Sequence, residues 1–289
     1  MKKWMKMTAT MMVAAMALTA CGGNDAADDS ADAGETYTVG IIQQLEHPAL
    51  DQATKGFEDK LTELLGDKVK FDYQNAQGEQ TNCTTIATKF VSNDVDLIMA
   101  NATTALQAAA AATGDIPIVG TSVTDYKTAG VVDSNEKPGR NVTGVSDLAP
   151  VDQQIQLLMK LVPDTKKVGI VYCSAEPNSA YQAKLAEAEL DKEGIAWAEF
   201  TAADSNEVQS VVTGEEGMCS GCGLATLSIS YYDLGVKAAE MAYEILTNGA
   251  DPAQMAIGYV TDGITEKYNA DIAEALNITI PEDMVAIEN

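Results

Sequence analysis

The chain has 289 residues, a formal net charge of -25, 46% hydrophobic residues and five cysteines. Because nucleic-acid phosphates repel so acidic a protein, this charge excludes a nucleic-acid-binding protein. The length is enough for a large core and favours one large or two medium domains.

Residues 1–21 have the pattern of an export signal. Lys2, Lys3 and Lys6 precede an apolar run that is too short to span a membrane comfortably, and Leu18-Thr19-Ala20 lead to Cys21. This order predicts export, lipidation of Cys21 and cleavage before it, and hence a bacterial lipoprotein anchored to the membrane. A signal peptide with a chance cysteine is the alternative. Residues 22–36 are small and acidic, which predicts a flexible linker.

The first part after the linker alternates between strand and helix patterns. Apolar β-branched runs predict strands at 37–43, 69–73, 95–100 and 116–120. Apolar residues spaced by three and four predict helices between them, at 50–65, 84–91 and 105–112. A short strand at 141–146 follows, and Pro150 opens a helix that leads onward. Such alternation predicts a parallel sheet with helices on both faces.

The second part starts with the same alternation and then breaks it. Strands at 166–173 and 195–200 flank a helix at 179–193, and another helix begins in SNEVQSVV, which ends at Val212. In the first part the corresponding helix leads into a strand, a helix and a strand, whereas here the chain runs directly into TGEEG. By this comparison roughly 30 to 40 residues are missing. We interpret the gap as a deletion; a second part with fewer strands is the alternative.

The fold class that follows is α/β, with two doubly wound parallel-sheet lobes. Lobe one is expected at 37–146 and a truncated lobe two at 147–256, with the gap near 212–214 and with 257–289 returning towards the lobe interface. Because ligands bind at the carboxyl ends of parallel strands, we expect a ligand cleft between the lobes.

Long segments of the chain resemble one family. The segments are GIIQQLEHPALDQATKGF, IPIVGTSVTD, KPGRNVTGVSDLAPVDQQIQLL and GEEGMCSGCGLATLSISYYDLG. They resemble the ABC-transporter substrate-binding proteins of the tryptophan/tyrosine-binding type, and the resemblance covers nearly all of 37–289. It implies the type I periplasmic-binding-protein fold, an aromatic amino acid as ligand, and an ABC permease and its ATPase as partners. It also implies that family members have a strand, a ligand-facing loop, a helix and a strand where this chain has its gap.

Hydroxyl side chains are the candidates for binding an amino-acid carboxylate. They follow two strands of the first lobe and open a helix, whose first N–H groups carry partial positive charge. These residues are Thr103, Thr104, Thr121 and Ser122. Structural capping of a helix is the alternative role for each.

Acidic side chains are the candidates for binding the ammonium group. Each follows a strand end or its missing equivalent: Asp125, Asp147, Glu176 and Glu215. In so acidic a chain, a solvated carboxylate is the alternative for each.

Further candidates line the expected cleft. Glu46 and His47 resemble the family's first ligand-facing loop, Asn178 and Ser179 approach from lobe two, and Tyr231 offers an aromatic face, with buried packing as its alternative. His47 is the single histidine, and with no Ser-His-Asp or Cys-His arrangement in the sequence we expect a polar wall and no catalytic base.

Cys219 and Cys222 form a Cys-x-x-Cys motif in an expected Gly-rich loop, whose expected role is to place Glu215 and Glu216 at the cleft. A thioredoxin-like motif starts a helix, which this loop does not. A structural zinc needs about four ligands, and the remaining Cys83, Cys173 and His47 are scattered. We therefore expect no metal and no redox cofactor, although a disulfide formed after export stays open.

The sequence thus predicts a non-enzymatic, lipid-anchored, extracytoplasmic receptor of an ABC importer. It captures a small amino-acid-like ligand and delivers it to the permease. Two alternatives remain: a degenerate lipoprotein that no longer binds, and an exported Cys-x-x-Cys thiol or metal protein.

Overall fold

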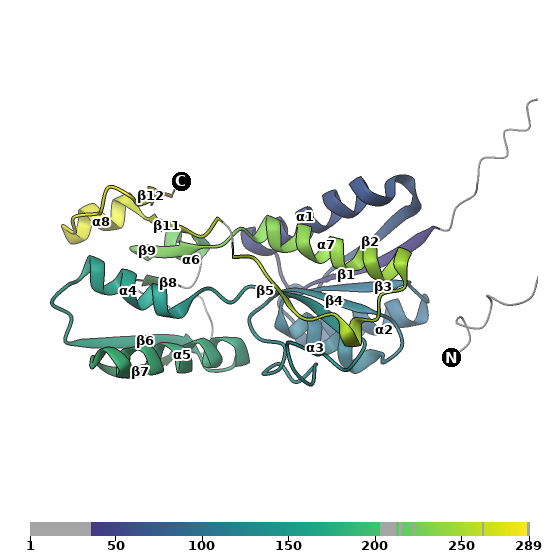
Figure 1. The fold of residues 1–289 in the computed structure, drawn as a ribbon, viewed down its shortest axis with the longest axis horizontal. Helices are drawn as coiled ribbons and strands as arrows, with labels where there is room; N and C mark the ends of the chain where they lie inside the picture. The colour runs from purple at the N-terminus through teal and green to yellow at the C-terminus, as the bar shows by residue number, and fades with distance from the viewer. Residues whose placement is uncertain (1–35, 203–211, 214–215, 222, 262, 288–289) are drawn as a thin grey trace, which may run out of the picture. The chain divides into compact units, whose positions relative to one another are not determined.

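The computed structural model describes residues 36–202, 212–213, 216–221, 223–261 and 263–287 (Figure 1). The predicted export signal with Cys21, nearly all of the predicted linker, and the residues Glu215 and Cys222 lie outside the described residues. Within the described ranges, no helix combines the length and the apolar character needed to cross a membrane.

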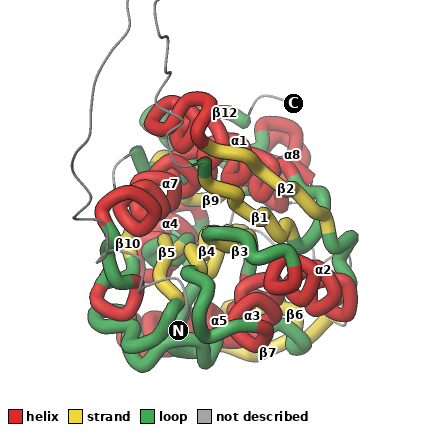
Figure 2. Tube along the Cα trace, turned by 90° about the vertical axis from the view of Figure 1, so that its right-hand side faces the viewer, coloured by secondary structure: helices red, strands yellow, loops and turns green. Residues whose placement is uncertain are grey.

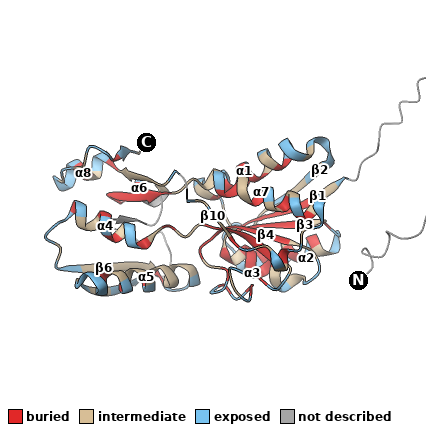
Figure 3. Ribbon diagram, in the orientation of Figure 1, coloured by how far each residue is buried: buried red, intermediate tan, exposed pale blue. Residues whose placement is uncertain are grey.

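A six-stranded parallel sheet, here called the first sheet, forms the centre of the first half. Its order is β10-β5-β4-β3-β1-β2. The strands are β1 (Tyr37–Gln43), β2 (Val69–Asn75), β3 (Leu97–Asn101), β4 (Ile118–Val123), β5 (Val142–Ser146) and β10 (Gly258–Tyr259). β1, β3, β4 and β5 are nearly all buried, as continuous apolar runs require in a sheet covered on both faces (Figure 3).

Helices cover both faces of the first sheet (Figure 2). On one face, α1 (Pro48–Leu65) and α7 (Tyr231–Asn248) pack on Val39, Ile41 and Met99; on the other, α2 (Gln80–Ser92) and α3 (Thr103–Ala112) pack on Ile42 and Ile98. Successive residues of a strand thus pack into the two cores on opposite faces of the sheet, because side chains in a strand alternate between its faces. The 3-10 turns η1 (Gly66–Lys68) and η3 (Pro252–Gln254) complete this half.

The second half contains two separate sheets. One is the parallel pair β6 (Lys167–Cys173) and β7 (Ala196–Ala202). The other has the order β12-β11-β9-β8, with β9 and β11 antiparallel; its strands are β8 (Val212–Thr213), β9 (Ala225–Ser228), β11 (Thr265–Tyr268) and β12 (Val285–Ala286). The helices are α4 (Val151–Leu161), α5 (Pro177–Glu193), α6 (Glu216–Gly221) and α8 (Ala270–Leu276).

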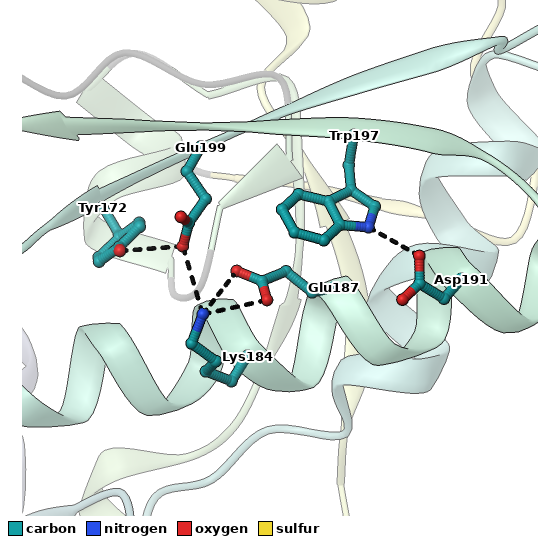
Figure 4. Close-up of polar contacts among 6 residues, drawn as sticks. All are labelled: Tyr172, Lys184, Glu187, Asp191, Trp197 and Glu199. Atoms are coloured by element: carbon teal, nitrogen blue, oxygen red, sulfur yellow. Dashed lines mark hydrogen bonds and ion pairs between the residues drawn. The ribbon is translucent and has the colours of Figure 1, made fainter.

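The pair β6–β7 is far less buried than the first sheet (Figure 3). Gly169 is exposed and Phe200 remains 57% exposed, although both belong to strands with the apolar runs of a sheet interior. Lys184 of α5 pairs with Glu199 of β7 at 3.6 Å and also bonds Glu187 of its own helix at 3.2 Å (Figure 4). A two-stranded sheet on its own is marginally stable, so this pair has the character of a sheet fragment.

The structure confirms the α/β class and the doubly wound first half, and it differs from the sequence predictions in three places. Val212, expected in a helix, lies in β8, while 203–211 lie outside the described residues. The expected loop around Cys219 contains the short helix α6. Residues 231–256, expected in lobe two, pack on the first sheet, because the apolar face of α7 meets Val39, Val119 and Val145. The periodicity of a helix shows its apolar face but not its partner.

Candidate functional site

The N-terminus of α3 lies directly after β3 and lacks a side-chain cap. Its N-cap residue Ala102 has φ 89°, a strained value for alanine, and its methyl side chain makes no bond to the first N–H groups. Thr103 at the first helical position is buried and Thr104 is half-buried. A strained residue held by its surroundings is a feature of functional sites, and uncapped N–H groups at a helix start attract an anion.

A β-bulge in β4 places two hydroxyls beside this helix start. The register of β4 with β5 shifts between Gly120 and Val123, and Ser122 takes φ 56°. The backbone carbonyl of Thr121 accepts a bond from Ala102 N–H at 3.0 Å. Thr121 Oγ1 and Ser122 Oγ are buried and have no hydrogen-bond partner among the described residues. Because a buried hydroxyl without a partner costs about 1–3 kcal/mol, these two groups favour a ligand that satisfies them.

Asp147 follows the neighbouring strand β5. Its backbone N–H donates to Val123 O at 3.2 Å, and its Oδ2 accepts from Tyr231 Oη at 3.1 Å. Tyr126 donates to Val145 O at 3.0 Å, and burial, followed by the charge of Asp147, raises the pKa of its phenol well above the usual value. A carboxylate therefore lies one strand from the hydroxyls of β4.

The loop after β1 contains two predicted site residues, Glu46 and His47, and His47 bonds the helix that follows. His47 is the N-cap of α1, and its Nδ1 accepts from Ala49 N–H at 3.3 Å, while Glu46 is exposed. The backbone of this loop is joined to the same sheet edge, since Gln44 N–H donates to Asn101 O at 3.2 Å. The ends of β1, β3, β4 and β5 thus lie next to one another in the sheet order.

Asp125 and the candidates on α5 are engaged with other side chains. Asp125 accepts from Thr128 N–H at 2.6 Å and from Asn135 Nδ2 at 2.7 Å; burial raises its pKa, but these bonds outweigh it, so the pKa is lowered. Ser179 Oγ donates to Glu176 Oε2 at 2.9 Å at the start of α5, and Asn178 is half-buried there. Glu215 lies outside the described residues, and its neighbour Glu216 pairs with Lys267 at 2.7 Å.

Sequence reasoning missed two residues with buried polar atoms that have no partner among the described residues. Asn101 at the end of β3 uses its Nδ2 for Leu50 O at 2.8 Å and Thr54 Oγ1 at 3.0 Å, which leaves its Oδ1 without one. Gln154 on α4 has the same property at Nε2. A polar residue that ends a buried strand was a usable signal for Asn101, whereas the run DQQIQ offered none for Gln154.

A surface depression of about 470 Å³ lies away from this edge, between α1 and α7. Lys60, Leu64, Lys237 and Met241 are among its lining residues. Its two ammonium groups are already paired, Lys60 with Glu63 at 3.0 Å and Lys237 with Tyr259 O at 2.7 Å. It offers no unsatisfied buried polar group, and we therefore place the candidate site at the sheet edge.

The family follows from comparison with known proteins. A family model described as "ABC transporter substrate binding protein" matches residues 38–217. The chain belongs to this family. The substrate-binding protein is also 37% identical over 274 residues to the tyrosine-binding protein of Clostridioides difficile (strain R20291), with 79% of each chain covered.

Two solved structures have the same fold. A domain from Streptococcus pneumonia in complex with L-Trp has a TM-score of 0.81 and 31% identity. A ligand-free, open substrate-binding protein with adhesive properties from Clostridium difficile has a TM-score of 0.73 and 33% identity. Each comparison covers 88% of this substrate-binding protein and 100% of the other chain.

The tyrosine-binding protein has residues at aligned positions where this chain has none. It runs over 274 positions, whereas 79% of this 289-residue substrate-binding protein is about 228 residues. At several tens of the aligned positions, the tyrosine-binding protein therefore has a residue and this chain has a gap.

Cys219 of the substrate-binding protein is fully buried near the end of α6, where its Sγ lies 3.5 Å from Gly223 O. A helix C-terminus does not stabilise a thiolate, since its partial charge is negative. Among the described residues, no three His, Cys, Asp or Glu side chains are grouped to hold a metal ion.

Replacing Cys219 with alanine is expected to leave ligand affinity within about twofold, because this buried thiol belongs to a local packing contact in α6. Isothermal titration of the variant with the ligand of the wild type measures this. Loss of binding with an unchanged melting temperature would favour the exported thiol protein instead.

Proposed function

We propose that this substrate-binding protein binds an aromatic L-amino acid at the carboxyl edge of the first sheet and delivers it to an ABC permease. The observation that carries the proposal is the pair of buried hydroxyls on Thr121 and Ser122, which have no partner among the described residues. They adjoin the uncapped start of α3. Both features suit a carboxylate.

The three parts of an amino acid have complementary groups at this edge. The carboxylate accepts from the first N–H groups of α3 and from the hydroxyls of Thr103, Thr121 and Ser122. The ammonium donates to Asp147, whose neighbour Tyr231 offers a ring to the side chain. An aromatic ligand is supported by the two relatives that are named for binding tyrosine or contain L-Trp.

The remaining candidates belong to the rim and to the second half. Thr104, Glu46 and His47 border the same edge, while Asp125 shapes the neighbouring turn. Glu176, Asn178 and Ser179 belong to the second half and complete the site when the halves close. Glu215 lies outside the described residues and stays a candidate from the sequence. Ligand contacts on both halves favour the closed state, which the permease recognises.

The protein acts outside the cytoplasm as a lipoprotein. Its basic and apolar N-terminal residues and the cysteine at 21 support export and lipid anchoring, and the acidic segment 22–36 serves as a tether. The ABC permease and its ATPase are its partners, as for the family. No catalytic step, metal or cofactor is involved.

A second candidate function is that of a degenerate lipoprotein that no longer binds. The half-exposed pair β6–β7 and the extra positions of the tyrosine-binding protein favour a deleted strand, helix and strand. Uncovered apolar surface costs about 25 cal/mol per Å². Whether the second half still closes on a ligand therefore decides between a receptor and a non-binding chain.

Thermal melting of the chain from residue 22 onwards tests the proposal, with L-tryptophan, L-tyrosine, L-phenylalanine, branched amino acids and nucleosides. A ligand at about 100 times its Kd stabilises by about 2.7 kcal/mol, which raises Tm by roughly 5 to 10 °C at this size. A shift with one aromatic amino acid alone supports the receptor. No shift here, beside a shift in a variant with the strand, helix and strand restored, identifies a degenerate chain.

A further inference from the structure

The helix α5 contacts the β6–β7 pair of the second half through side-chain hydrogen bonds and an ion pair. Trp197 Nε1 of β7 donates to Asp191 of α5 at 2.9 Å, and Tyr172 Oη of β6 donates to Glu199 at 3.0 Å, which Lys184 of α5 also contacts (Figure 4). These side chains join α5 to β7, and β7 in turn to β6. α5, β6 and β7 therefore pack together as one part of the second half.

One side chain of this helix reaches the first half. Gln182 Nε2 lies 3.4 Å from Thr124 Oγ1. Thr124 is the first residue after β4 and lies two positions after Ser122, the second of the two unsatisfied hydroxyls. The preceding residue, Tyr181, is half-buried; burial raises the pKa of its phenol, and the charges of Asp125 and Tyr259 add to this. Gln182 of α5 thus contacts a surface of the first half at Thr124.

That surface is held in place by its own hydrogen bonds. Thr124 is buried, and its carbonyl accepts from Ser146 Oγ at 2.7 Å. Ser146 Oγ in turn accepts from Leu148 N–H at 3.1 Å, in the segment that crosses to α4. Asn135 bonds Asp125 at 2.7 Å. These hydrogen bonds therefore connect the surface to a crossing point of the chain.

The contact is not a consequence of chain connection. The described chain passes between the halves at 147–150, at 229–230 and, with residue 262 outside the description, at 260–264. Gln182 and Thr124 belong to none of these segments and are 58 positions apart. Their distance depends on how the two halves meet.

We propose that Gln182 is a positioning residue for ligand capture, whose bond to Thr124 forms only when the second half closes over the ligand edge. The inference rests on the proposed function and extends it, because neither residue touches the ligand in that proposal. Breaking the bond raises the free energy of the closed state alone. Ligand affinity then falls by the factor that corresponds to this rise in free energy.

A double-mutant cycle on the full exported chain tests the bond. Gln182→Ala and Thr124→Val are each expected to raise the Kd of the aromatic amino acid about two- to tenfold, the loss of one neutral hydrogen bond. The double variant is expected to be no weaker than the worse single one. Gln182→Glu, which keeps the length and accepts from the threonine hydroxyl, is expected to restore binding. Gln156→Ala, an exposed glutamine on α4, is the matched control.

A cross-linking measurement, made without and with the aromatic amino acids, separates failure of this inference from failure of the proposed function. Thr124→Cys and Gln182→Cys in one chain are treated with a short bismaleimide, and the cross-linked peptides are identified by mass spectrometry, with each single variant as control. A link between positions 124 and 182 supports the contact even if no amino acid binds. Absence of the link both without ligand and in the presence of the aromatic amino acids, additive Kd effects in the cycle, or no rescue by Gln182→Glu would overturn it.

Discussion

Replacing Asp147 with asparagine is expected to weaken binding of the aromatic amino acid about tenfold to 150-fold, which corresponds to the loss of about 1.5–3 kcal/mol for a hydrogen bond to a charged group. The carboxylate follows β5, is half-buried, and accepts from Tyr231 Oη at 3.1 Å. Asparagine keeps the size and one acceptor oxygen but removes the negative charge that balances the ligand ammonium. Isothermal titration at neutral pH measures the change.

The matched control is Asp115→Asn, an exposed carboxylate in the turn between α3 and β4. It changes the net charge by the same amount at a distance from the candidate edge, so its Kd is expected to stay within about twofold because of ionic screening. If the Asp147 variant binds as tightly as this control, the ammonium does not lie at Asp147 and the proposed orientation of the ligand is wrong.

Replacing Gly235 with alanine is expected to destabilise the protein by about 1–3 kcal/mol or more. α1 and α7 approach so closely that a Cβ at Gly235 would lie 2.0 Å from Ala53 O and 2.8 Å from Phe57 N. A backbone carbonyl cannot yield as a flexible side chain does, so the helices must separate. Gly56 faces the same restriction, with Tyr232 O at 2.1 Å from its Cβ position.

Thermal melting measures this effect, and a fall of roughly 2 to 12 °C in Tm is expected for a domain of this size. Gly114→Ala is the control, because a Cβ there meets nothing within 4 Å and its φ is not in the left-handed region. Equal melting temperatures for the two variants would contradict the close packing of α1 on α7. Since α7 begins with Tyr231, separated helices would also disturb the ligand edge.

Much of the first half could be predicted from local pattern. The apolar run 37–43 is β1 with identical bounds, and the expected helix at 50–65 is α1 with two more residues at its start. These predictions succeed because the period of apolar residues reflects burial directly. Thr121 and Ser122 were expected after a strand at 116–120, whereas the structure places both inside β4, near its carboxyl end. Whether these residues contact a ligand stays a prediction.

Other features depended on contacts between distant residues. Glu216 was expected at the cleft, but its Oε2 accepts from Ser228 at 2.8 Å and pairs with Lys267 at 2.7 Å. His47 became a helix cap. A carboxylate or an imidazole has the same local sequence signature whether it contacts a ligand, a lysine or a backbone N–H. Its partner is chosen by the packing.

The sequence by itself determined the alternation of strands and helices, the family and the break near 212. The alternation follows from local periodicity, and the family and the break follow from the segments and their order along the chain. Only the tertiary structure decided that α7 packs on the first sheet, that β6 and β7 form a separate pair, and that Thr124 meets Gln182. These outcomes depend on which apolar faces and polar groups find one another across the folded chain. Such pairings are long-range, and no window of sequence contains both partners.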